Sequence, residues 1–194
     1  MDDDQILAQR LANLKNEPPN HERYKKKLLA VFPDEIPSCD LFFPNTFDGN
    51  DRLYYLRSLS LFENKKWFEV DLNQLYKTFT NLTCLTTAGE IYYLPTFLLY
   101  FWELKHLDLE YFDCFIDFID GVVVEWELGS DEMHRKFDYT KFETLTIEQA
   151  KLIATFLVNT ANLLPDDYFL SLQAQRALNN YWGRFLFSSI EKVN

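Results

Sequence analysis

The sequence predicts a mainly α, compact single-domain fold with one to three short β-strands, and three observations lead to it. Apolar residues recur at spacings of three and four along most of the chain, which is the period of a helix. Asp, Thr and Pro residues stand where such segments begin or end. Only one short segment, 122–128, alternates between apolar and polar residues as a strand does. With 194 residues, of which 47% are hydrophobic, the chain can bury one core over residues 1–194.

The N-terminal part is predicted to form helices within residues 3–32. Apolar residues share one helical face in 3–16, Pro18 and Pro19 end that helix, and a second helix covers 21–31. Three further prolines predict a proline-rich loop over 33–50. Segment 52–70 fits a short helix and strand material equally well, so its structure stays open.

Central helices are predicted within residues 71–120. Asp71 is a plausible N-cap for a helix that ends near Leu82. Pro95 is interpreted as the first-turn proline of the most apolar helix, because proline suits that position. Asp108 would begin a further helix that runs to about Ile119. The most apolar run is too short for a bilayer, which needs about 20 residues, so we expect no membrane segment.

A strand and turn are predicted within 121–140, and a C-terminal helical hairpin within 145–188. The strand rests on the alternation in 122–128, and Gly129-Ser130 closes it. Thr146 and Gln149 have the spacing of a capping box, which predicts a helix start there. Pro165 would end this helix, and Asp166 would begin the last one.

Charge and cysteine content restrict the class of partner and the compartment. The chain has 30 Asp and Glu against 19 Lys and Arg, so its formal net charge is −11. Nucleic acids and anionic membranes are therefore poor partners, and a basic protein is the better electrostatic match. Cys39, Cys84 and Cys114 are too few and too scattered for a disulfide framework. Together with an acidic N-terminus that lacks an apolar signal segment, this predicts a cytoplasmic protein.

Catalytic signatures are sparse. The sequence contains no G-x-S-x-G, P-loop or G-x-G-x-x-G motif, so we predict no cofactor and no nucleotide site. Glu103 and His106 have the i, i+3 spacing that di-iron bundles use, and Asp131 and His134 repeat it with Asp in a turn. A metal-binding or hydrolytic enzyme built on Glu103, His106 and His134 is therefore the alternative, although a di-iron site needs two further glutamates on facing helices.

The most informative feature is a segregated negative charge. Residues 103–132, called the acidic segment below, hold ten acids and the single base Lys105, for a net charge of −9. Like charges on one surface repel, and such a surface suits the capture of a basic partner. A solvated polar surface is the other interpretation. Tyr111 and Tyr139 are candidate interface anchors beside it. The predicted partner-binding residues are Glu110, Asp113, Asp117, Asp120, Glu125, Glu127, Asp131 and Glu132.

Three segments resemble a bacterial family of small proteins of unknown function. That family is marked by an aromatic-aromatic-Leu-Pro-x-Phe-Leu segment, here Tyr92–Leu98, and by a Leu-Thr-x-x-Gln helix start, here Leu145–Gln149. Residues 24–37, which include Ala30-Val31-Phe32-Pro33, precede them, and Trp67, Phe156-Leu157 and Tyr181-Trp182 complete the resemblance in order.

The family has no established catalytic residues, and small acidic proteins of this kind are often immunity proteins of polymorphic toxin or contact-dependent inhibition systems. The resemblance thus implies a non-enzymatic immunity protein, monomeric or a small homo-oligomer. It would bind a cognate, basic toxin, such as a nuclease, and mask its active site. A non-toxin adaptor protein is a further alternative.

Overall fold

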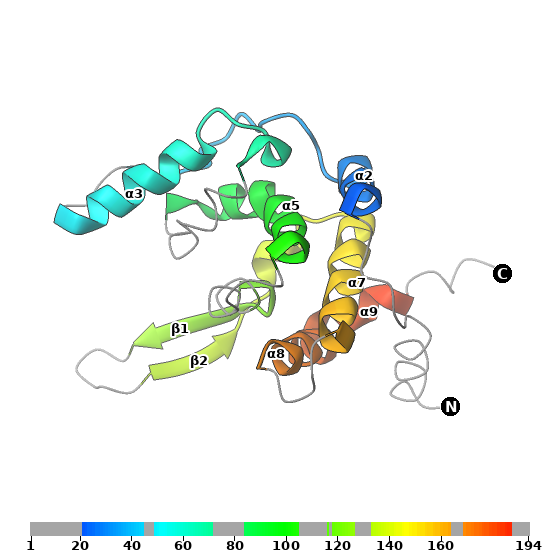
Figure 1. Ribbon diagram of the computed structural model, residues 1–194. Coiled ribbons are helices and arrows are strands. Elements are labelled where there is room, and N and C mark those ends of the chain that lie inside the picture. Colours follow the sequence, from blue (N-terminus) through cyan, green and yellow to red (C-terminus); the bar gives the residue numbers. More distant parts are fainter. Residues whose placement is uncertain are drawn as a thin grey trace, which may run out of the picture. The chain divides into compact units, whose positions relative to one another are not determined.

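The structure is a computed structural model that describes residues 21–44, 49–71, 84–104, 116, 118–126, 133–163 and 169–187 (Figure 1). Most of these residues are helical, which confirms the mainly α prediction. The chain divides into two compact units, one formed by residues 21–111 and one that contains residues 112–194. The prediction of one domain stays a prediction.

The first unit contains helices α2 (His21–Val31), α3 (Gly49–Phe62) and α5 (Thr87–Leu104), with a short 3-10 turn at Trp67–Glu69. The bounds of α2 agree with the sequence prediction. Segment 52–70, which was open, forms most of α3 and the 3-10 turn. The helix predicted from Asp71 to Leu82 lies almost wholly outside the described residues. Among the described residues of this unit, the largest fully buried side chains are Leu28, Phe62, Trp67, Tyr93 and Phe97.

Helix α5 corrects the prediction that Pro95 lies in a first helical turn. The helix begins eight residues earlier, where the Thr86 carbonyl accepts the Glu90 N–H and the Thr86 hydroxyl accepts the Gly89 N–H. An interior proline costs a helix about 3 kcal/mol. Residues 92–99 are all buried, and this packing offsets the cost. Neither α5 nor any other helix in the described ranges is long and apolar enough to cross a membrane.

The second unit contains helices α7 (Ile147–Leu163), α8 (Phe169–Ala177) and α9 (Gly183–Phe187), with a π-helical segment at Leu178–Trp182 and a 3-10 turn at Thr140–Phe142. The predicted capping box at the start of α7 is confirmed. The Gln149 N–H donates to Thr146 Oγ1 (3.2 Å), and the Thr146 N–H donates to Gln149 Oε1 (2.8 Å). Helix α7 packs against α8 and α9, as the predicted C-terminal hairpin requires.

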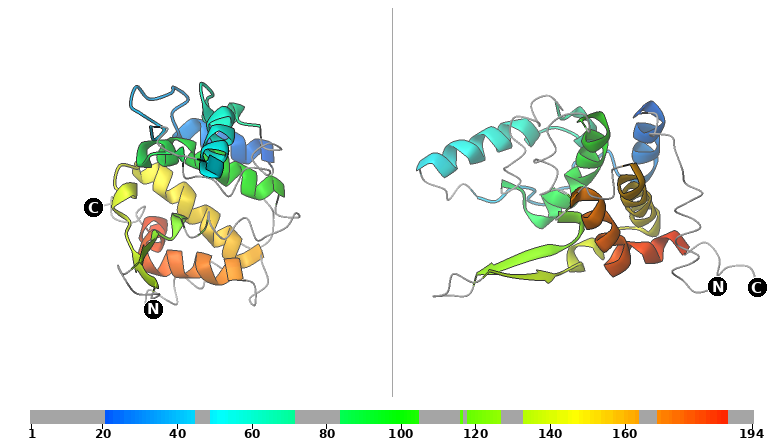
Figure 2. Two further views of the ribbon diagram at one scale, coloured as in Figure 1. Left: turned by 90° about the vertical axis from the view of Figure 1, so that its left-hand side faces the viewer. Right: turned by 60° about the horizontal axis from the view of Figure 1, so that its bottom comes forward.

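Two strands complete the second unit as an antiparallel hairpin, β1 (Val122–Trp126) and β2 (Met133–Phe137). Its register pairs Val122 with Phe137 and Trp126 with Met133. The alternating pattern predicted β1, whereas β2 was not predicted individually. The right-hand view of Figure 2 shows the hairpin extending beyond the helices of its own unit. Gly121 precedes β1 with a φ of 66°, a conformation that favours glycine.

Candidate functional site

The structure describes only part of the predicted acidic site. Glu125 lies on β1, where His134 of β2 is its register partner. Asp120 is the other described member, and its contacts with Tyr139 and Arg176 are described. The remaining six predicted binding residues lie outside the described residues: Glu110, Asp113, Asp117, Glu127, Asp131 and Glu132.

The predicted role of Asp120 in an exposed acidic face is wrong, because Asp120 is fully buried. Its Oδ2 accepts a hydrogen bond from Arg176 Nε (2.5 Å), and its Oδ1 accepts one from the Tyr139 hydroxyl (3.3 Å). The helical spacing in the sequence predicted that Asp120 shares one helical face with Asp113 and Asp117. However, the helix ends at this position, and the turn at Gly121 directs the chain into β1. Asp120 therefore stabilises the second unit from within.

Tyr139, a predicted interface anchor, packs against residues of its own unit. Its ring stacks on Tyr181, with 4.4 Å between centroids and 6° between planes, and the Arg184 guanidinium lies 3.9 Å from the Tyr181 ring centroid. Burial, reinforced by the negative charge of Asp120, raises the pKa of Tyr139 to about 12. The hydroxyl therefore stays protonated at neutral pH and serves as the donor to Asp120.

The alternative metal site gains no support from the described residues. Glu103 lies in the last turn of α5, and His106 falls outside the described ranges. His134 lies on strand β2, and its predicted companion Asp131 falls outside the described ranges. Among the described residues, no group of three or more His, Cys, Asp and Glu side chains could hold a metal ion.

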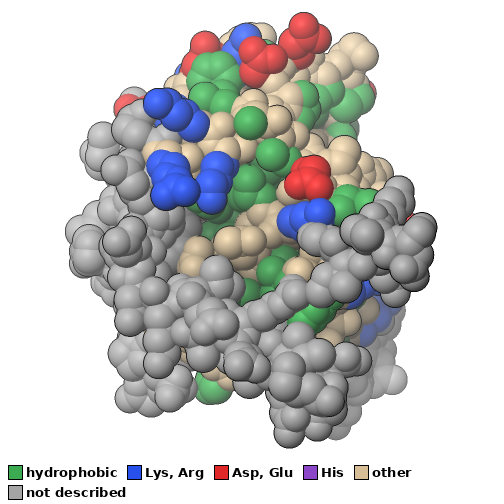
Figure 3. Space-filling view, turned by 90° about the vertical axis from the view of Figure 1, so that its right-hand side faces the viewer, with side chains coloured by type: hydrophobic (Ala, Val, Ile, Leu, Met, Phe, Trp, Pro, Cys, Tyr) green, Lys and Arg blue, Asp and Glu red, His purple; other side chains and the backbone are tan. Residues whose placement is uncertain are grey.

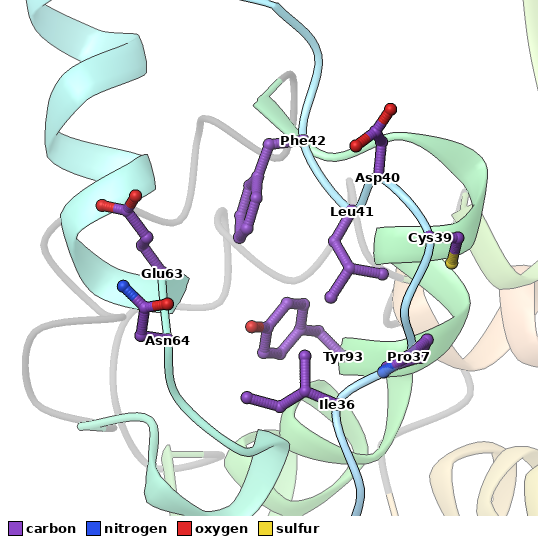
Figure 4. Close-up of a pocket in the computed structure, with 9 residues that line it drawn as sticks. All are labelled: Ile36, Pro37, Cys39, Asp40, Leu41, Phe42, Glu63, Asn64 and Tyr93. Carbon is purple, nitrogen blue, oxygen red and sulfur yellow. The ribbon is translucent and has the colours of Figure 1, made fainter.

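A cavity of about 300 Å³ lies in the first unit (Figure 4). It is open to solvent and is lined by the loop that follows α2, the two residues after α3 and Tyr93 of α5. Figure 4 shows Glu63 and Asn64 on one side of a group of apolar side chains, with Asp40 and Cys39 on the other. The lining residues are Ile36, Pro37, Cys39, Asp40, Leu41, Phe42, Glu63, Asn64 and Tyr93.

Backbone hydrogen bonds fix the loop wall of the cavity to the start of α5. The Thr86 N–H donates to the Leu41 carbonyl, and the Phe43 N–H donates to the Cys84 carbonyl, both at 3.0 Å. The Thr86 hydroxyl also donates to the Asp40 carbonyl (2.8 Å). Gly89 allows this close approach, because a Cβ there would lie only 2.1 Å from the Leu41 oxygen. The wall is thus preformed rather than assembled by a ligand.

Tyr93 forms the floor of the cavity and is held in place at its far end. The Tyr93 hydroxyl lies 2.7 Å from the Phe62 carbonyl and 3.0 Å from the Lys65 carbonyl, so its single proton is shared between two acceptors. Burial raises the pKa of Tyr93, which keeps the hydroxyl protonated. The ring, rather than the hydroxyl, is the surface that Tyr93 offers to a ligand.

Only acidic and neutral side chains line the described cavity. The two nearby lysines are engaged elsewhere, since Lys65 Nζ donates to the Ser60 and Leu61 carbonyls and Lys66 pairs with Asp34 at 3.6 Å. Asn64 closes the end of α3 with a φ of 58°, a conformation that asparagine tolerates better than most residues. In Figure 4 the polar side chains of the lining point away from the apolar group, and the lining residues include no histidine for acid–base chemistry.

Basic side chains lie close together on helix α2 rather than around the cavity. Arg23, Lys26 and Lys27 of α2 are exposed, in a protein that is acidic as a whole. Figure 3 shows Lys and Arg side chains close together on the side of the molecule that carries α2. Helix α2 therefore carries a local cluster of positive charge.

Cys84, beside the cavity wall, gives a prediction for high pH. Burial raises the pKa of this thiol to about 11 from 9.0, so the folded state disfavours the thiolate. The resulting stability is complete below pH 9 and is lost as the pH rises towards 11. We expect Cys84 to account for a loss of about 1 kcal/mol between pH 8 and pH 10, measured by urea unfolding. Cys84→Ala should remove this loss and Cys39→Ala, at an exposed thiol, should not; equal behaviour of the two variants would contradict the assignment.

The comparison with known families gives one match. Residues 51–185 match the model of a Family of unknown function (DUF6714). The chain belongs to this family. The matched region contains the whole acidic segment, most of helix α3, and helices α5, α7 and α8, whereas the loop that forms one wall of the cavity precedes it. No curated protein and no solved structure matches the chain.

Proposed function

We propose that this member of the family is an immunity protein, a non-enzymatic inhibitor that binds and neutralises a basic bacterial toxin in the cytoplasm. The observation that supports this proposal is the acidic segment. With Asp120 engaged inside the fold, nine acids remain against the single Lys105. Glu125 places part of this charge on the β-hairpin, which extends beyond the helices of its unit (Figure 2).

The mechanism follows from charge complementarity. Carboxylates on the hairpin and on the preceding segment accept hydrogen bonds from Lys and Arg residues that a nuclease-like toxin uses to hold its own anionic substrate. Long-range attraction raises the association rate, and the bound inhibitor blocks the active site. No catalytic group is needed on the inhibitor. The residues that carry this role are Glu110, Asp113, Asp117, Glu125, Glu127, Asp131 and Glu132.

Charge reversal tests the acidic segment directly. The triple variant Asp113→Lys, Asp117→Lys, Glu125→Lys should bind the toxin domain at least about tenfold more weakly, with a smaller dependence on salt, because attractive pairs become repulsive. The toxin domain used is the C-terminal domain of the protein encoded by the neighbouring gene. Affinity is measured by calorimetry at low and high salt.

A control variant carries the same change in net charge elsewhere. Glu35→Lys, Glu143→Lys and Glu148→Lys replace three exposed acids outside the acidic segment. We expect this control to bind within about twofold of the wild type. If both triple variants lost affinity equally, net charge rather than this surface would govern binding, and the acidic segment would be excluded as the interface.

A further inference from the structure

We propose that a basic stripe on helix α2 binds the acidic segment of a second copy of this chain. The basic stripe consists of Arg23, Lys26 and Lys27. This inference goes beyond the proposed function. It uses the acidic segment but needs no toxin, so either proposal can fail while the other holds.

The packing of α2 determines which of its faces reaches solvent. Helix α2 packs against α5, and Tyr24 and Leu28, which lie four residues apart on one face, are buried. Arg23, Lys26 and Lys27 are spaced by three and four residues, so they share a different face, and all three are exposed. Figure 3 shows basic side chains close together on the side of the molecule that carries α2. The stripe is therefore one continuous surface of the first unit.

The positive charge of the stripe is not neutralised within the described structure. Residues 21–31 hold four bases and the single acid Glu22, for a net charge of +3. In the described part of the chain, neither Lys26 nor Lys27 takes part in an ion pair. Arg23 and Lys27 are like charges at i and i+4, an arrangement that destabilises a helix. An acidic partner would relieve this repulsion.

The surroundings of the stripe argue against a lipid surface and a nucleic acid as its partner. A helix that binds a membrane inserts its apolar face, whereas the apolar residues Tyr24 and Leu28 of α2 are buried inside the protein. Specific complexes with nucleic acid commonly neutralise about 6–10 phosphates. The stripe offers three basic side chains on a chain whose net charge is −11. A protein surface with several carboxylates is the class of partner that fits.

Every copy of this chain carries such a surface. The acidic segment has a net charge of −9, and the chain as a whole is negative. Two copies therefore attract each other best when the stripe of one faces the acidic segment of the other, because most other approaches bring like charges together. Each copy carries both surfaces, so the contact can form twice in one pair of copies and close a dimer.

Sedimentation equilibrium of the full chain tests the association. We expect a dimer that forms at roughly 200 µM chain in about 50 mM salt and dissociates in about 500 mM salt, because salt screens the attraction between the two surfaces. A chain that stays monomeric at low salt overturns the proposal. A dimer that high salt does not weaken overturns it as well.

Charge reversal separates the stripe from net charge. Lys26→Glu with Lys27→Glu should weaken self-association at least about tenfold, because attraction at the contact becomes repulsion. Arg52→Glu with Arg57→Glu makes the same change in net charge at two exposed arginines of α3 and should leave self-association within about twofold of the wild type. All four side chains are exposed, so neither pair disturbs the core. Equal weakening by both pairs overturns the assignment to α2.

Mixing two variants identifies the surface that the stripe binds. The Lys26→Glu, Lys27→Glu variant keeps the acidic segment, and the triple variant of the acidic segment described above keeps the stripe. Each variant alone should self-associate at least about tenfold more weakly than the wild type. A mixture should form a heterodimer more tightly than either variant forms a homodimer, because the intact stripe of one copy meets the intact acidic segment of the other. No gain in association on mixing overturns the proposal.

Discussion

Arg176→Met should lower the free energy of unfolding by about 3–5 kcal/mol, because it removes the guanidinium that pairs with the fully buried Asp120 carboxylate. Asp120→Asn should cost less. The Arg176 side chain is 36% exposed, although its Nη2 is buried, whereas the Asp120 side chain is fully buried, so the charge left behind by Asp120→Asn is the better solvated of the two. The order of the two losses, measured by urea unfolding of both single variants and the double variant, reports which member of the pair lacks access to solvent.

The matched control is Arg184→Met, the same substitution at an exposed arginine of the same unit. Arg184 lies over the rings of Tyr181 and Phe185, and its loss should cost about 1 kcal/mol or less. A loss for Arg176→Met no greater than that for Arg184→Met would refute a buried ion pair. So would a larger loss for Asp120→Asn than for Arg176→Met.

Gly89→Ala should destabilise the protein by about 3 kcal/mol or more, although alanine normally stabilises a helix by up to about 1 kcal/mol relative to glycine. The new Cβ would lie 2.1 Å from the Leu41 oxygen and 3.0 Å from the Leu41 carbonyl carbon. Both are backbone atoms, so no side chain can move aside. The loop must leave α5 and lose its hydrogen bonds to Thr86, which also removes one wall of the cavity. Thermal unfolding measures the loss in stability.

Gly49→Ala is the control for this effect. Gly49 has a φ of 60°, and nothing lies within 4 Å of a Cβ built there. Alanine at this position bears backbone strain alone, which costs about 1 kcal/mol. If Gly89→Ala were as stable as the wild type, the close approach of the loop to α5 would be incorrect, and the preformed cavity with it.

The sequence predicts elements well where their signals are local. Helix α2 and the capping box of α7 depend on residues within one turn of each other, and both are confirmed. Pro95 was misplaced because burial of residues 92–99 offsets the cost of an interior proline, and burial is a tertiary effect. Segment 52–70 stayed open because Leu53 and Leu56 are exposed although apolar, which obscures the helical face of α3.

The two candidate sites also differ in how far local sequence signals reveal them. Counting charges is sufficient to find the acidic segment, but not to separate Asp120 from Asp113 and Asp117. That distinction depends on where the helix ends and on Arg176, 56 residues further along the chain. The cavity could not be predicted, because long-range backbone bonds join the loop after α2 to the start of α5. Gly89 is the one local sequence feature that we can relate to the cavity, and an isolated glycine in a helical pattern has many explanations.

Co-expression with the toxin domain encoded by the neighbouring gene tests the proposed function most directly. The account predicts that the toxin domain alone arrests growth and that co-expression restores it. The two proteins should co-purify and elute as one complex from size exclusion at low salt, with partial dissociation at high salt. A domain that remains toxic and elutes separately at low salt would contradict the immunity function, and a complex without toxicity would instead indicate a non-toxin adaptor.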